Sequence, residues 1–181
     1  HMLRGLCVVF ANMTFFLGLA AMPLADAVAI FFISPLVITL FSVLFLGEVV
    51  GPRRWAAIAV GFIGVLVMMR PGSQAFQMAS LLPLAAAFCY AGIHIITRRI
   101  GGTESAATMA FYIQMMFIVV GVSFGLIVGD GRFGDQSDPS LAFLFRAWSW
   151  PVAADYPVFL IIGVGIGIGG FLISQAYRGA E

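Results

Sequence analysis

Apolar runs of about twenty residues recur along this sequence, and the charged residues stand between them. A membrane-spanning helix needs about 20 largely apolar residues. The sequence has six runs that meet or approach this length: Leu3–Ala21, Ala27–Leu46, Trp55–Met69, Met78–Thr97, Ser105–Gly129 and Tyr156–Tyr177. The polar–apolar alternation of barrel strands is missing from Ala27–Leu46. We therefore predict an all-α, polytopic integral membrane bundle with six transmembrane helices.

The overall composition excludes several classes of protein. Hydrophobic residues make up 62% of the 181 residues and charged residues only 9%, whereas soluble domains average about 45–50% and about 25%. The formal net charge of +1 provides no field for a polyanion. A soluble enzyme, a disordered tail and a nucleic-acid binder are all excluded, and the lipid bilayer is the expected partner.

The arginines indicate how the chain is oriented. With the start of the first span on one side, that side receives six arginines and the other side three: Arg4, Arg53, Arg54, Arg98, Arg99 and Arg178 against Arg70, Arg132 and Arg146. Because cytoplasmic loops carry the excess of basic residues, the first side is predicted to be cytoplasmic. The long loop 130–155 is then external. Its aromatic second half predicts a short segment lying at the membrane surface.

Polar groups and aromatic rings inside the spans are the candidates for a solute-binding wall, because polarity at membrane depth is costly and often marks function. Pro35 is expected to kink the second span and turn it towards a cavity. Each candidate has a structural alternative: an asparagine can join helices, the kink at proline can be purely structural, and a histidine near a span end can be a satisfied interfacial residue. The candidates are Asn12, Phe15, Phe16, Ser34, Pro35, Thr39, Tyr90, His94, Gln114 and Gln175.

Charged residues near the end of the second span have a different expected role. Glu48, followed closely by Arg53 and Arg54, is predicted to be a structural anchor at the cytoplasmic face, with an ion pair fixing the turn. The sequence shows no catalytic constellation, and we expect no metal and no cofactor. Cys7 and Cys89 match no metal or redox spacing.

The first and last spans resemble each other. Phe16–Asp26 aligns without gaps to Phe171–Glu181, with matching Phe, Leu and two Ala, and Asp against Glu. The two copies are five spans apart, so they must cross the membrane in opposite directions. This is the inverted-topology repeat that many secondary transporters use.

Several short segments, in order, resemble the EamA domain of the drug/metabolite transporter superfamily. They are Leu24–Ala29, Ser34-Pro35, Leu46-Gly47-Glu48, Arg53-Arg54-Trp55, Gly61–Val65, Arg70-Pro71 and Ala176-Tyr177-Arg178. The resemblance implies a ten-helix fold of two inverted five-helix halves, in which these spans resemble the third to eighth helices. It places a partial first repeat at 1–73 and a partial second repeat at 74–181, the latter containing the external loop 130–155.

The resemblance implies a permease that moves a small organic solute by alternating access. The expected location is a bacterial inner membrane. The alternative is a non-transporting membrane protein that packs through glycine-rich helix faces, such as Gly121-Gly125-Gly129. A homodimer is one form that either could take. A membrane-embedded enzyme ranks last because no catalytic cluster supports it.

Overall fold

The computed structural model describes residues 2–69, 78–100 and 106–179, without side-chain detail at 100, 106, 107, 109 and 170–179. Helices and no strands occur in these ranges. Contacts divide the chain into two units, 1–147 and 148–181. The first unit holds α1 (Met2–Ala21), α2 (Leu24–Phe31), α3 (Ser34–Leu46), α4 (Pro52–Met69), η1 (Met78–Ser80), α5 (Leu81–Ile100), α6 (Ala106–Val128) and α7 (Pro139–Phe145); the second holds η2 (Ala153–Asp155) and α8 (Tyr156–Gly179).

The all-helical membrane class is confirmed. Within the described ranges, five segments are long and apolar enough to cross a membrane: Met2–Ala21, Leu24–Leu46, Pro52–Met69, Met78–Arg99 and Ala110–Val128. The last predicted span corresponds to η2 and α8, where the apolar stretch Ala153–Gly169 is shorter than the five spans above. The sixth crossing and the ten-helix repeat remain predictions.

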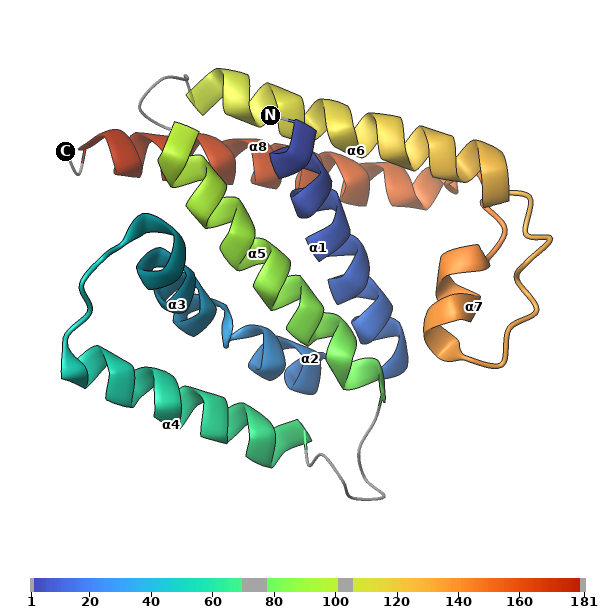
Figure 1. Ribbon diagram of the computed structural model, residues 1–181. Helices are drawn as coiled ribbons and strands as arrows, with labels where there is room; N and C mark the ends of the chain where they lie inside the picture. The colour runs from blue at the N-terminus through green and yellow to red at the C-terminus, as the bar shows by residue number, and fades with distance from the viewer. Residues whose placement is uncertain (1, 70–77, 101–105, 180–181) are drawn as a thin grey trace. The chain divides into compact units, whose positions relative to one another are not determined.

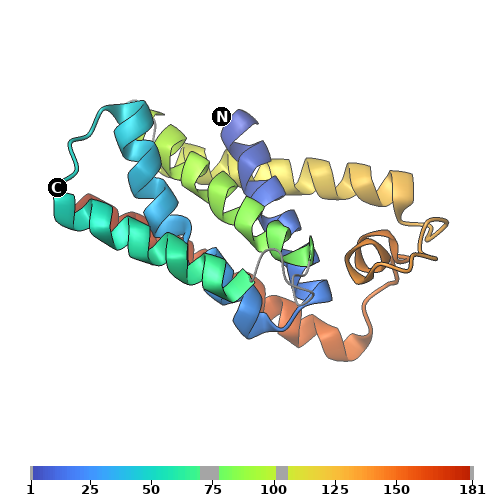
Figure 2. The ribbon, with the colours of Figure 1, turned by 60° about the horizontal axis from the view of Figure 1, so that its bottom comes forward.

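Helices α1 and α5 lie side by side in Figures 1 and 2, and they run in opposite directions. A Cβ atom at Gly18, near the end of α1, would lie 2.8 Å from Cδ of Pro83, near the start of α5. Small residues allow such close helix approach inside a membrane, where dispersion contacts replace the hydrophobic effect as the main attraction.

The second span is broken where proline was expected to kink it. Helix α2 ends at Phe31 and α3 begins at Ser34, with Pro35 in the first turn of α3, and Figure 1 shows the interruption. Proline has no N–H to donate to the carbonyl of Phe31, and its ring crowds the preceding turn. The predicted kink is therefore confirmed.

Two small apolar clusters hold α2, α3 and α4 to the rest of the first unit. In one, Ile33 and Val37 pack on Ala87 and Ala91 of α5. In the other, Met69 at the end of α4 packs with Met22, Ala27 and Ile30. Most of α4 is exposed, with only Ile58 and Met69 buried, so the described part of the chain leaves its apolar surface uncovered.

In the first unit, the directions of the helices bring together the ends that should lie on the same side of a membrane. Helix α6 runs parallel to α1, since Gly5 meets Met116 while residues 16 and 124 line one cavity. Helix α3 runs parallel to α5, and α4 runs antiparallel to α3, where Gly61 meets Leu36. The starts of α1, α4 and α6 thus share one end with the ends of α3 and α5. This is the alternation that a multi-pass chain requires.

The repeat boundary expected near residue 73 does not separate compact bodies. Helix α5, assigned to the second repeat, packs on α1, α2 and α3 of the first. The domain boundary at 73/74 stays a prediction. The second copy of the repeat, 171–181, lies outside the residues whose side chains are described.

Candidate functional site

Four aromatic side chains from three helices form a continuous row, which we call the aromatic ladder: Phe15, Phe31, Tyr90 and His94. The ring centroids of Phe15 and Phe31 are 5.1 Å apart, and those of Phe31 and Tyr90 are 5.5 Å apart. Tyr90 and His94 follow at 4.7 Å in an edge-to-face arrangement. These are the separations at which aromatic pairs attract each other beyond simple burial.

Local structure explains why these rings meet. Tyr90 and His94 are four residues apart on α5 and so lie on one face. Phe31 is the last residue of α2, and the break before Pro35 sets where it ends. Tyr90 is 39% exposed, while the other three rings are half-buried. Tyr90 is therefore the most exposed ring of the ladder.

A second feature lies on another face of α1, between α1, α6 and α7, and we call it the α1–α6 cavity. Its volume is about 320 Å³. Asn12 carries its one polar side chain, and its Nδ2 donates to the carbonyl of Val8 at 2.9 Å. The lining residues are Val9, Asn12, Met13, Phe16, Leu17, Phe117, Val120, Gly121, Phe124, Phe143 and Leu144.

The structure therefore assigns the residues of the predicted solute-binding wall to two separate features. Asn12 and Phe16 line the α1–α6 cavity, whereas Phe15, Tyr90 and His94 belong to the ladder. Neighbouring positions on a helix point about 100° apart, so Phe15 and Phe16 serve different faces. Their roles in binding a solute remain predictions.

Ser34, Pro35, Thr39 and Gln114 belong to neither feature. Ser34 is buried, and Pro35 is exposed at the start of α3. The Thr39 hydroxyl donates to the carbonyl of Pro35 at 3.0 Å, so it is occupied by its own helix. Gln114 is exposed on α6. The side chain of Gln175 lies outside the described residues.

Sequence reasoning missed Phe31, which occupies the centre of the ladder. Its one signal was its position four residues before Pro35, where the helix must break. Phenylalanine occurs 18 times in the chain, so composition could not distinguish this ring from one facing lipid.

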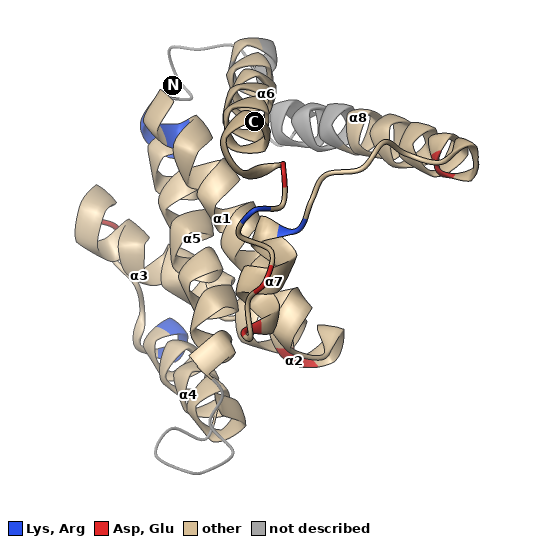
Figure 3. Ribbon diagram, turned by 90° about the vertical axis from the view of Figure 1, so that its right-hand side faces the viewer, with Lys and Arg blue, Asp and Glu red and all other residues tan. Residues whose placement is uncertain are grey.

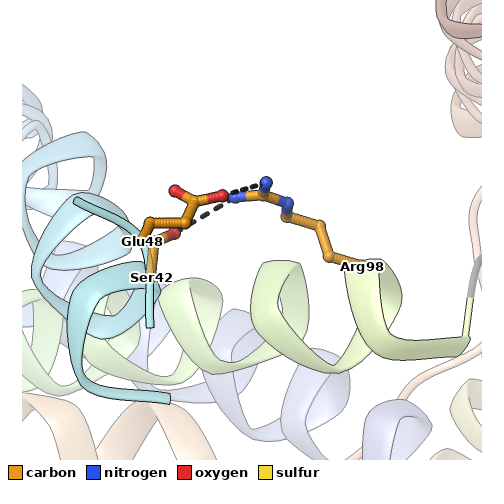
Figure 4. A network of polar contacts seen from close by, with 3 residues as sticks. All are labelled: Ser42, Glu48 and Arg98. Atoms are coloured by element: carbon orange, nitrogen blue, oxygen red, sulfur yellow. Dashed lines mark hydrogen bonds and ion pairs between the residues drawn. The ribbon is translucent and has the colours of Figure 1, made fainter. Parts of the chain in front are cut away.

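Glu48 forms an ion pair, but its partner is on another helix, and its role as an anchor stays a prediction. Glu48 pairs with Arg98 at the end of α5, and Arg98 also donates to the hydroxyl of Ser42 at 3.3 Å (Figure 4). Arg99 donates to the carbonyl of Phe45 at 2.7 Å. Arg53 and Arg54 are exposed. The turn is thus fixed across the bundle by α5.

The end of α3 is shaped to present these groups. Gly47 has φ of +68°, the left-handed conformation that commonly closes a helix. The N–H of Glu48 donates to the carbonyl of Ser42 at 3.3 Å. The carboxylate is thereby turned towards α5. Figure 3 shows that charges mark the ends of the helices and leave the middles of α1 and α5 uncharged.

No group of three or more His, Cys, Asp or Glu side chains that could hold a metal ion occurs in the described part of the chain. The membrane-spanning helices define a multi-pass membrane protein, the class to which secondary transporters belong.

Comparison with known proteins finds a family match. Residues 2–70 match the EamA-like transporter family, and the alignment to one relative named as a transporter covers the whole chain. The chain is thus similar to a family of transporters. No solved structure matches it.

Three relatives illustrate the range of names. A riboflavin transporter of Rhizobium johnstonii is 29% identical over 100% of this chain and 54% of its own length. A riboflavin transporter of Vibrio cholerae is 34% identical over 64% of this chain and 39% of its own length. An S-adenosylmethionine uptake transporter of Rickettsia felis is 33% identical over 80% of this chain and 48% of its own length. The chain thus spans about half the length of the curated relatives it matches.

Proposed function

We propose that this chain is the part of an EamA-type permease that lines the path of a small organic solute. The solute would cross a bacterial inner membrane by alternating access, the mechanism of inverted-repeat transporters. The family and the bacterial relatives support this proposal. It assigns no chemical reaction to the chain.

The aromatic ladder is the observation that carries the proposal, and it favours a flat heteroaromatic solute. Ring faces and edges attract other rings, and Tyr90 offers an exposed one. Riboflavin and S-adenosylmethionine, which name the relatives, both contain a flat nitrogen-rich ring system. Phosphate recognition usually uses arginine or lysine, and the ladder contains neither. A neutral or zwitterionic solute therefore fits better than a sugar phosphate.

Uptake of radiolabelled riboflavin and S-adenosylmethionine into liposomes containing the protein tests the proposal. Tyr90→Leu should lower uptake of the transported compound about twofold to tenfold, because one ring contact contributes about 0.5–1.5 kcal/mol. Tyr90→Phe should retain most of it. Phe10→Leu, at an exposed ring of α1 outside the ladder, is the matched control. Unchanged uptake in Tyr90→Leu would refute the ladder as the solute wall.

The alternative is a non-transporting protein that packs through glycine faces such as that of Gly121. A Cβ atom at Gly121 would meet nothing within 4 Å, and the free space beside it is the α1–α6 cavity. Other glycines already serve contacts inside the chain, such as Gly18 against Pro83. Crosslinking to one stoichiometric protein, with no flux of any solute, would favour this alternative.

A further inference from the structure

The α1–α6 cavity combines apolar rings with a single polar group, and the ladder does not use it. Four of its lining residues are phenylalanines, contributed by three different helices: Phe16, Phe117, Phe124 and Phe143. Its volume of about 320 Å³ falls at the small end of the range for small-molecule sites, about 300–1,000 Å³. The size and the rings suit a compact aromatic molecule.

Asn12 sets the polarity that such a molecule must have. It lies in the middle of α1, at a depth where a polar group without a partner is costly. Its Nδ2 donates to the carbonyl of Val8, and its Oδ1 keeps the capacity to accept. Within the described part of the chain, no donor bonds this oxygen. A ligand that carries an N–H or O–H group could donate a hydrogen bond to this oxygen.

Helix α7 covers the outer part of the cavity with Phe143 and Leu144. The Ser140 hydroxyl donates to the carbonyl of Leu17 at 2.8 Å, which ties α7 to the end of α1. The loop returns on itself, since a Cβ atom at Gly131 would lie 2.7 Å from that of Ala147, and Gly131 has φ of +78°. Helix α7 thus forms one wall of the cavity, which stays partly open on its other sides, where Asn12 is exposed.

We propose that the α1–α6 cavity binds an uncharged aromatic molecule of the indole or phenol class, through its phenylalanine rings and a hydrogen bond to Asn12. This site lies on a different face of α1 from the ladder. The inference does not depend on transport, because it concerns binding alone.

Binding of indole and of 1-methylindole to the protein in lipid nanodiscs tests the inference, because the methyl group removes the N–H donor. Saturation-transfer NMR would report the affinities. The ratio of the indole affinity to the 1-methylindole affinity should be about fivefold higher for the wild type than for Asn12→Leu. One net hydrogen bond accounts for a difference of this size. Comparing the two proteins in identical nanodiscs cancels the partition of each ligand into lipid.

A second variant tests the place of binding. Gly121→Phe puts a ring into the open space beside α6 and should abolish specific indole binding. Gly64→Phe is the matched control, because nothing lies within 4 Å of a Cβ at that exposed position of α4. Circular dichroism would show that both variants remain folded.

Three outcomes would overturn the inference. The first is no indole binding by the wild type, as expected if a lipid chain fills the cavity. The second is equal discrimination between the two indoles in wild type and Asn12→Leu. The third is binding that survives in folded Gly121→Phe. Since no measurement here involves solute flux, failure of this inference and failure of the transport proposal are distinguishable.

Discussion

Single residues in this protein matter mainly through what they touch across helices. Glu48 illustrates the point, because its carboxylate reaches Arg98, fifty residues along the chain, while Arg53 and Arg54 remain exposed. Glycines behave in the same way. Gly18 and Gly64 are both helical glycines, yet only Gly18 lies against another helix.

Gly18→Val is expected to destabilise the bundle by about 1–3 kcal/mol, the usual cost of overpacking. The new side chain would meet the rigid ring of Pro83, whose Cδ lies 2.8 Å from the Cβ position. The gain in helix propensity over glycine is smaller, at most about 1 kcal/mol. Unfolding in mixed detergent micelles, followed by circular dichroism, would measure the change.

Gly64→Val is the control, because its Cβ position on α4 has nothing within 4 Å. It should leave stability unchanged or raise it slightly through propensity. If both variants lost the same stability, the close contact between α1 and α5 would not be the cause.

At the scale of elements, hydropathy predicted nearly everything about the spans and little about the site. The runs of apolar residues marked the helices, because lipid requires every backbone group to be bonded within its own helix. Proline marked the break before α3. The packing of α7 on α1 was not foreseen, since a surface segment was expected there. It depends on a contact between Ser140 and Leu17, 123 residues apart.

The same limit applies to the candidate site. The spacing of Tyr90 and His94 on one helix face could be read from the sequence. Their meeting with Phe31 and Phe15 could not, because it depends on how three helices pack. Periodicity describes one helix at a time, so it combined the two sides of α1 into one wall.

Ser140→Ala is expected to loosen α7. The hydroxyl of this buried residue makes the 2.8 Å bond to the carbonyl of Leu17, and one such bond contributes about 0.5–1.5 kcal/mol net. Amide hydrogens of α7 should therefore exchange about twofold to tenfold faster, with little change in α1. Hydrogen–deuterium exchange with mass spectrometry would measure this.

Ser137→Ala serves as the comparison for α7, because Ser137 is exposed in the same loop. It should leave exchange in α7 as in the wild type. Equal acceleration by both variants, or none in Ser140→Ala, would show that the tie to α1 does not hold α7 in place.

The first unit as a whole separates its charges between two ends. Arg4, Glu48, Arg98 and Arg99 lie at the end where α1 begins and α3 and α5 finish, and Arg53 and Arg54 begin α4 at that same end. Asp26 and Asp138 lie at the other end, beside the start of α2 and of α7. Because the excess of arginine marks the cytoplasmic side, this arrangement predicts the topology of the chain in the membrane.

Labelling of single cysteines in intact cells would test that topology. In a background with Cys7→Ala and Cys89→Ala, Ser137→Cys should react with a membrane-impermeant maleimide added outside. Arg54→Cys, exposed at the opposite end of the unit, should react only after the cells are permeabilised. The reverse pattern would mean that the short loops do not follow the arginine excess. Labelling of both sites from outside would be inconsistent with an odd number of crossings between them, as α4, α5 and α6 require.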